Sequence, residues 1–132
     1  MGQRLPPLLK KCSSRQLVMW AAASRDFYPI HYDPACAQEH GLSGVIVPGA
    51  LKAAFFGQLL HDWLGVAGQI RHFSASYQKM DYPGQEIRCL GRVTKKYRQE
   101  DDCLLELYLW IESGEQKTTV GRALVLLPSR QV

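Results

Sequence analysis

Residues 48–65 read P-G-A-L-K-A-A-F-F-G-Q-L-L-H-D-W-L-G, and the architecture of the chain follows from this segment. Pro48 and Gly49 begin it, and Gly65 follows Leu64 as a stop signal, so the sequence predicts one long helix. Apolar residues cover most of the circumference of that helix. A helix that is apolar nearly all round must be enclosed. We therefore expect the rest of the chain to wrap around it.

The chain after this helix changes to a strand pattern. Leu105, Leu107 and Leu109 alternate with acidic and aromatic residues, which is typical of a sheet with one face in the core. Turn signals at Tyr82-Pro83-Gly84 and Ser113-Gly114 separate the apolar runs. We expect strands over Gln69–Met80, Glu86–Tyr97, Cys103–Glu112 and Lys117–Leu127. This order favours an α+β domain in which a curved antiparallel sheet wraps around the long central helix.

Shorter elements are expected before the long helix. Ser13 or Ser14 can cap a helix over Arg15–Ser24. Asp33-Pro34 has the N-cap and first-turn residues of a second, short helix that stops at Gly41. On the outer face of the expected sheet, Tyr108 and Trp110 indicate either a partner surface or a region covered by a loop.

The length, charge and cysteine content exclude several classes of protein. A chain of 132 residues with a net charge of +4 fits one soluble domain, and no apolar run reaches the ~20 residues that span a bilayer. The basic run Arg92–Arg98 is interpreted as a solvated strand end, with attraction of an anionic cofactor, such as one that carries the phosphates of coenzyme A, as the alternative. Nucleic acid binding is disfavoured because no stacking motif accompanies the charge. Without a secretory signal, the scattered cysteines indicate reduced thiols in a cytoplasmic protein.

The segment before the long helix carries the candidate chemistry. Residues 24–31 read S-R-D-F-Y-P-I-H, and Pro29 prevents a continuing helix between Asp26 and His31. A carboxylate and an imidazole on a rigid turn can share one water molecule, while the free N–H of Gly49 can receive a developing oxyanion. These parts suit the addition or removal of water at an activated carbonyl compound. In the alternative interpretation, Asp26 caps a turn and His31 binds buried carbonyl groups.

These motifs resemble those of MaoC-like (R)-specific enoyl-CoA hydratases and acyl dehydratases, which have the hot-dog fold. The family pattern S-G-D-x-N-P-x-H corresponds to S-R-D-F-Y-P-I-H here, and I-V-H-G-M corresponds to I-V-P-G-A at residues 46–50. The similarity extends over the G-x-x-L-P-P-L start, the Y-P-G-Q-E-I turn and a closing strand that ends at Pro128.

The resemblance implies a single hot-dog domain over residues 1–132 and a defined reaction. A trans-2-enoyl thioester would be hydrated reversibly to the (R)-3-hydroxyacyl thioester, with Asp26 and His31 as the acid–base pair. Gly49 would be the oxyanion donor. The substrate would be carried by coenzyme A or an acyl carrier protein, with no cofactor and no metal. The acyl chain would pass Phe55 or Phe56, although we interpret both side chains as core.

Three departures from the family pattern bear on these expectations. Tyr28 replaces an asparagine, Arg25 replaces a glycine, and Pro48 replaces a histidine beside the oxyanion donor. The later D-W-x-G at residues 62–65 resembles a subgroup similar to steroid side-chain hydratases, which act with a second hot-dog subunit. We therefore expect a homodimer or higher oligomer joined through the sheet, or a pairing with a second hot-dog subunit.

Two other functions remain open on the sequence. The hot-dog fold also hosts acyl-CoA thioesterases, because a fold does not determine its chemistry. The altered turn also allows a non-catalytic acyl-binding subunit. Among the remaining polar residues, Lys52 and Arg71 are interpreted as solvated charges, with contact to a phosphate group as the alternative.

Overall fold

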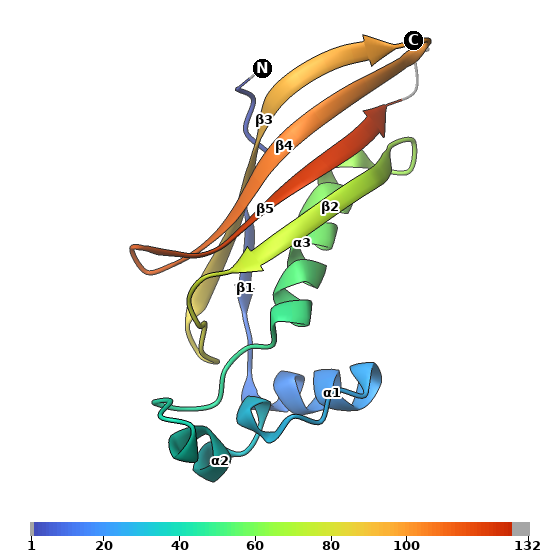
Figure 1. Ribbon diagram of the computed structural model, residues 1–132. Helices are drawn as coiled ribbons and strands as arrows, with labels where there is room; N and C mark the ends of the chain where they lie inside the picture. The colour runs from blue at the N-terminus through green and yellow to red at the C-terminus, as the bar shows by residue number, and fades with distance from the viewer. Residues whose placement is uncertain (1, 128–132) are drawn as a thin grey trace.

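In the computed structural model, which describes residues 2–127, one long helix lies against the concave face of a curved sheet (Figure 1). The strands form a single antiparallel sheet in the order β1-β3-β4-β5-β2. This confirms the expected α+β fold. The elements are β1 (Leu8–Lys11), α1 (Ser14–Ser24), the 3-10 turn η1 (Pro29–His31), α2 (Pro34–Glu39), α3 (Gly49–Leu64), β2 (Gln69–Tyr77), β3 (Glu86–Gln99), β4 (Asp102–Ser113) and β5 (Gln116–Leu127).

The four strands after α3 match the expected ones, although their ends are shifted. One further strand, near the start of the chain, was not expected. β2 ends at Tyr77 instead of Met80, because the N–H groups of Gln78 and Lys79 both donate to the carbonyl of Thr118 and leave the regular ladder. The short edge strand β1 was not expected, because four residues after two prolines show no strand periodicity. It pairs with β3, with Leu8 opposite Cys89. Pro128 lies outside the described residues.

The two short helices begin where the sequence predicts. Ser13 caps α1 by accepting a hydrogen bond from the Gln16 N–H at 3.0 Å. Asp33 caps α2 by accepting one from the Ala35 N–H at 3.0 Å. Both caps satisfy N–H groups that a helix end leaves free. In Figure 1, α1 and α2 lie together beyond the N-terminal end of α3.

The core forms where α3 meets the sheet. Phe55 and Phe56 are buried, which confirms their interpretation as core. Phe56 lies against Gly121 of β5, where an added Cβ would approach its ring to 3.1 Å. The helix is less enclosed than expected, because Ala54 and Gln58 on its other side are exposed. A single curved layer covers only one side of a helix. No helix among residues 2–127 has both the length and the hydropathy that a membrane crossing needs.

The outer face of the sheet carries an aromatic pair. Tyr108 and Trp110 stack with ring centroids 5.3 Å apart. Trp110 is nevertheless buried, and the Arg4 guanidinium lies 5.7 Å from its ring centroid. The segment before β1 continues along the edge of β3, since the Leu5 N–H donates to the Gly91 carbonyl and Arg4 forms an antiparallel bridge with Arg92. The Arg4 side chain extends from this edge toward the Trp110 ring.

Candidate active site

The turn between α1 and η1 holds Asp26 by its own backbone. Arg25 ends α1 in the left-handed conformation, with φ of 60°. The Asp26 N–H then donates to the Ser24 hydroxyl at 3.3 Å, and Asp26 Oδ1 accepts the Tyr28 N–H at 3.4 Å. The latter contact engages Oδ1, while the second carboxylate oxygen, Oδ2, faces His31.

His31 faces that second oxygen, and a hydrogen bond to the backbone holds its ring in place. The residue is 8% exposed, and Nδ1 lies 3.0 Å from the carbonyl oxygen of Ile46. A carbonyl can only accept, so Nδ1 carries the proton of this hydrogen bond. In the neutral ring Nε2 is then an acceptor. Nε2 lies 4.0 Å from Asp26 Oδ2, and the Asp26 side chain is 43% exposed. The pair therefore presents two acceptors, one on a buried ring and one on a partly exposed carboxylate.

The separation between these two atoms decides what can lie between them. A distance of 4.0 Å from Nε2 to Oδ2 is too long for a direct hydrogen bond. It allows one water oxygen to lie about 2.8 Å from both atoms, with one O–H directed at each. The arrangement can thus polarise a single water molecule from two directions.

Gly49 is the first residue of α3, so helix geometry leaves its N–H without an intrahelical acceptor, at the positive end of the helix dipole. The Ile46 carbonyl that holds His31 lies three residues earlier. Three Cα–Cα steps place the two Cα atoms within roughly 11 Å of each other. A Cβ added at position 49 would lie 2.9 Å from the Tyr77 ring, so this close approach requires glycine.

Tyr28, which replaces the family asparagine, lies beside the imidazole. Its ring meets the ring of His31 edge-on at a centroid distance of 5.9 Å and that of His40 at 6.0 Å. Its carbonyl accepts the His31 N–H at 3.2 Å. The backbone of residue 28 therefore braces the turn without a side-chain amide.

The structure corrects the interpretation of Lys52. It was expected to be a solvated charge, yet it is 2% exposed, and its Nζ lies 3.0 Å from Oδ2 of the fully buried Asp81. Asp81 carries no local sequence signal for this contact, because 29 residues separate it from Lys52. One signal was available: Lys52 follows Leu51 and precedes Phe55 on the apolar side of the helix.

The buried cysteines are poor nucleophiles. Burial raises the pKa of the Cys89 thiol to about 12, with Lys10 opposing and Asp81 adding to the shift. Burial also raises the pKa of Cys12, and the negative charge of Asp81 adds to that effect. Both thiols therefore stay protonated near neutral pH. Among residues 2–127, no three His, Cys, Asp or Glu side chains gather as a metal site would require.

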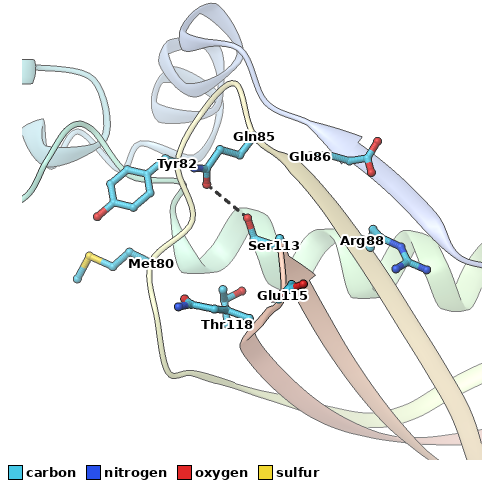
Figure 2. Close-up of a pocket in the computed structure, with 10 residues that line it drawn as sticks. Met80, Tyr82, Gln85, Glu86, Arg88, Ser113, Glu115 and Thr118 are labelled. Carbon is cyan, nitrogen blue, oxygen red and sulfur yellow. Dashed lines mark hydrogen bonds between the residues drawn. The ribbon is translucent and has the colours of Figure 1, made fainter.

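A hollow of about 760 Å³ lies apart from the Asp26–His31 pair, between the β4–β5 turn and the segment that enters β3 (Figure 2). Met80, Tyr82 and Arg88 line it, and the Ser113 hydroxyl donates to the Gln85 amide oxygen at 3.4 Å. Neither Asp26 nor His31 borders this hollow, so its lining does not supply the paired acid and base.

Comparison with known proteins places this chain in a family. The profile of the MaoC like domain matches residues 4–104. The chain belongs to the MaoC-like family. The (R)-specific enoyl-CoA hydratase of Aeromonas caviae is 31% identical to this MaoC-like chain over 122 residues, which are 92% of this chain and 90% of that protein.

Solved structures agree with the family assignment. The (R)-hydratase from A. caviae involved in PHA biosynthesis superposes on the MaoC-like chain with a TM-score of 0.86 at 32% identity, over 96% of both chains. The ChsH1-ChsH2 complex from Mycobacterium tuberculosis gives a TM-score of 0.84 over 98% of this chain and 97% of that one. Its identity of 19% supports the fold alone. The expected family and the expected hot-dog fold are both confirmed.

Proposed function

We propose that this protein hydrates a trans-2-enoyl thioester reversibly to the (R)-3-hydroxyacyl thioester, with Asp26 and His31 as the acid–base pair. The observation that carries the proposal is the 4.0 Å separation between His31 Nε2 and Asp26 Oδ2. Homology to the A. caviae hydratase supports hydratase or dehydratase chemistry. The family relationship alone does not specify the substrate. We propose an enoyl thioester because its hydration needs an acid–base pair such as Asp26 and His31.

The reaction uses the shared water in one addition and one protonation. The water oxygen forms a bond to C3 while one of its O–H bonds breaks, and the Asp26–His31 pair takes the proton. The electron pair of the C2–C3 double bond moves toward the thioester carbonyl, whose oxygen becomes enolate-like. A proton from the pair then forms the C–H bond at C2 and restores the carbonyl.

Gly49 stabilises the intermediate charge. Its N–H donates to the thioester oxygen, and the dipole of the 16-residue helix α3 favours negative charge there. Pro48 lacks an N–H of its own, so the donor at this helix start is Gly49. Loss of one such donor in other enzymes lowers kcat by about 10²–10³-fold.

Coenzyme A or an acyl carrier protein would carry the acyl group, and a second hot-dog chain would complete the assembly. The outer edge of β2 has no strand partner among residues 2–127, since β2 pairs only with β5. Phe73 and Tyr77 are exposed on this strand. An unpaired edge with exposed aromatic residues suits strand pairing with another subunit. We therefore propose a homodimer through this edge, with a second hot-dog protein as the alternative partner.

A substrate panel tests the proposal. Short, long and steroid enoyl-CoA thioesters are mixed with the purified protein, and loss of the enoyl absorbance is recorded. We expect turnover by the wild type and a loss of at least about 10²-fold in Asp26→Asn, because the acid–base pair is removed. Asp33→Asn makes the same change at the α2 cap and serves as the matched control. It should retain the wild-type rate.

The same samples separate hydration from the competing functions. A thiol reagent reports free coenzyme A, which hydration does not release. Thiol release that depends on Asp26, without loss of enoyl absorbance, would indicate a thioesterase. Thermal stabilisation by acyl-CoA without turnover, alone and with candidate partner subunits, would indicate a binding subunit. Either result contradicts the proposal.

A further inference from the structure

We propose that Lys52, Asp81 and Thr118 are positioning residues that hold backbone segment 46–49, and through it both His31 and Gly49. This inference rests on the proposed function, because it gives the network a role in the hydration step. None of the three side chains is placed in contact with the substrate. Their effect passes through the backbone that carries the oxyanion donor.

The three side chains form a closed buried cluster. Lys52 is 2% exposed, Asp81 is 0% exposed and Thr118 is 1% exposed. Asp81 Oδ2 accepts hydrogen bonds from Lys52 Nζ at 3.0 Å and from the Thr118 hydroxyl at 2.7 Å. Lys52 Nζ also donates to the Lys79 carbonyl at 3.2 Å. The cluster therefore joins the first turn of α3, the segment after β2, and β5.

The backbone of Asp81 connects this cluster to the candidate site. The Val47 N–H donates to the Asp81 carbonyl at 2.8 Å. On one side of Val47, the Ile46 carbonyl accepts a hydrogen bond from His31 Nδ1. The N–H of Ile46 donates to the Ile30 carbonyl. On the other side, Pro48 leads directly into Gly49. A shift of Asp81 would thus move the segment that joins the imidazole to the oxyanion donor.

Tyr77 gives a second, independent connection. The Lys52 ammonium lies 5.6 Å from the centroid of the Tyr77 ring, within the range of a cation–π interaction. A Cβ added at residue 49 would lie 2.9 Å from the same ring. Lys52 therefore influences the position of Gly49 both through helix α3 and through the ring of Tyr77.

The energetics favour a positioning role over simple stabilisation. A buried ion pair is on average no more stabilising than apolar residues of the same volume. Asp81 Oδ1 is also buried and has no hydrogen-bond partner among the described residues, which is costly for a carboxylate. A displacement of 1 Å can lower a catalysed rate by about 10²-fold. Accurate placement of residues 46–49 is therefore a sufficient reason for an otherwise unfavourable cluster.

Paired variants test this role while limiting the risk of misfolding. Thr118→Val removes one hydroxyl at nearly constant volume, and Thr118→Ser retains it. The double variant Lys52→Met/Asp81→Asn removes both charges together, so neither is left buried alone. Arg88→Met/Glu112→Gln removes the partly exposed Arg88–Glu112 pair, whose N–O distance is 3.5 Å, and is the control.

Steady-state hydration of an enoyl-CoA gives the first measurement. We expect kcat to fall about tenfold in Thr118→Val and about 10–100-fold in the double variant, with KM within about threefold of wild type. Thr118→Ser should regain kcat to within about twofold, and the Arg88/Glu112 control should not change it. A loss of thermal stability with unchanged kcat would overturn the proposal. So would an equal loss of kcat in the control.

Amide hydrogen exchange gives a measurement that does not need turnover. We expect faster exchange at Val47 and altered amide signals at Gly49 in Thr118→Val and in the double variant, with neither change in the control. An inactive wild-type enzyme would contradict the proposed hydratase function, and these signals would still decide the positioning role. Unchanged Val47 and Gly49 signals in both network variants would overturn that role, whatever the activity.

Discussion

The proton on His31 Nδ1 is donated to the carbonyl oxygen of Ile46 at 3.0 Å, which leaves Nε2 as the acceptor that faces Asp26. This hydrogen bond selects one tautomer of a ring whose two nitrogens are otherwise alternatives. It also ties the imidazole to the backbone that enters α3. The orientation of the imidazole and the start of α3 are therefore set by one short segment.

Replacement of the imidazole tests that orientation. We expect His31→Ala to lower kcat by about 10²–10⁴-fold, because one of the two acceptors for the shared water is lost. His40→Ala is the matched control, since His40 contacts the Tyr28 ring in the same edge-on way from an exposed position. Steady-state kinetics of both variants give the comparison. Equal effects of the two substitutions would contradict a special role for His31.

The contact between Gly49 and Tyr77 leads to a second prediction. Gly49→Ala should destabilise the protein by about 1–3 kcal/mol, because the new Cβ meets the Tyr77 ring at 2.9 Å. Gly57→Ala, in the same helix but with open space around the new Cβ, should stabilise it by about 0.5–1 kcal/mol. Urea unfolding of both variants measures these free energies. Destabilisation of the same size at position 57 would show that contact with the Tyr77 ring is not what limits residue 49.

Arg25 leads to a third prediction, because it holds a backbone conformation that favours glycine. Its φ is 60°, and an L-residue there costs about 1–2 kcal/mol. Arg25→Gly should therefore raise the free energy of unfolding by about 1 kcal/mol, which thermal denaturation can measure. Arg25→Ala keeps the Cβ and should give no such gain. If Arg25→Ala stabilises the protein equally, removal of the charge and not of the strain is the cause.

The buried thiol of Cys89 leads to a prediction for alkaline pH. Burial raises its pKa from 9.0 to about 12, so the fold favours the protonated thiol. The unfolded chain loses this proton first, so the stabilisation is complete below pH 9 and is lost as the pH rises toward 12. We expect the free energy of unfolding to fall less steeply across this range in Cys89→Ala than in wild type. Parallel pH profiles for the two proteins would contradict this cause.

The sequence predicted the elements with local signals more accurately than the contacts between them. The caps at Ser13 and Asp33 and the bounds of α3 depend on neighbouring residues, and they lie where expected. The resemblance also identified Asp26 and His31, which the fold brings to 4.0 Å. Their roles in the reaction, and that of Gly49, remain predictions.

The interactions that the sequence did not predict are long-range. The position of Lys52 on the apolar side of its helix was a weak local signal of burial, but its partner Asp81 comes beside it only when the chain folds. The hydrogen bond from His31 to Ile46 spans 15 residues and likewise depends on the tertiary fold. Strand β1 forms because its residues pair with the edge of β3. Tertiary contacts therefore determine the surroundings of the candidate site.

Hydration of an enoyl-CoA in ¹⁸O-labelled water, followed by mass and chiral analysis of the product, tests the proposed chemistry most directly. We expect one ¹⁸O atom in the hydroxyl group at C3 of an (R)-3-hydroxyacyl-CoA, formed by the wild type and not by Asp26→Asn. Label in a free carboxylic acid with release of coenzyme A, or an unlabelled and unchanged thioester, would contradict the addition of water by Asp26 and His31.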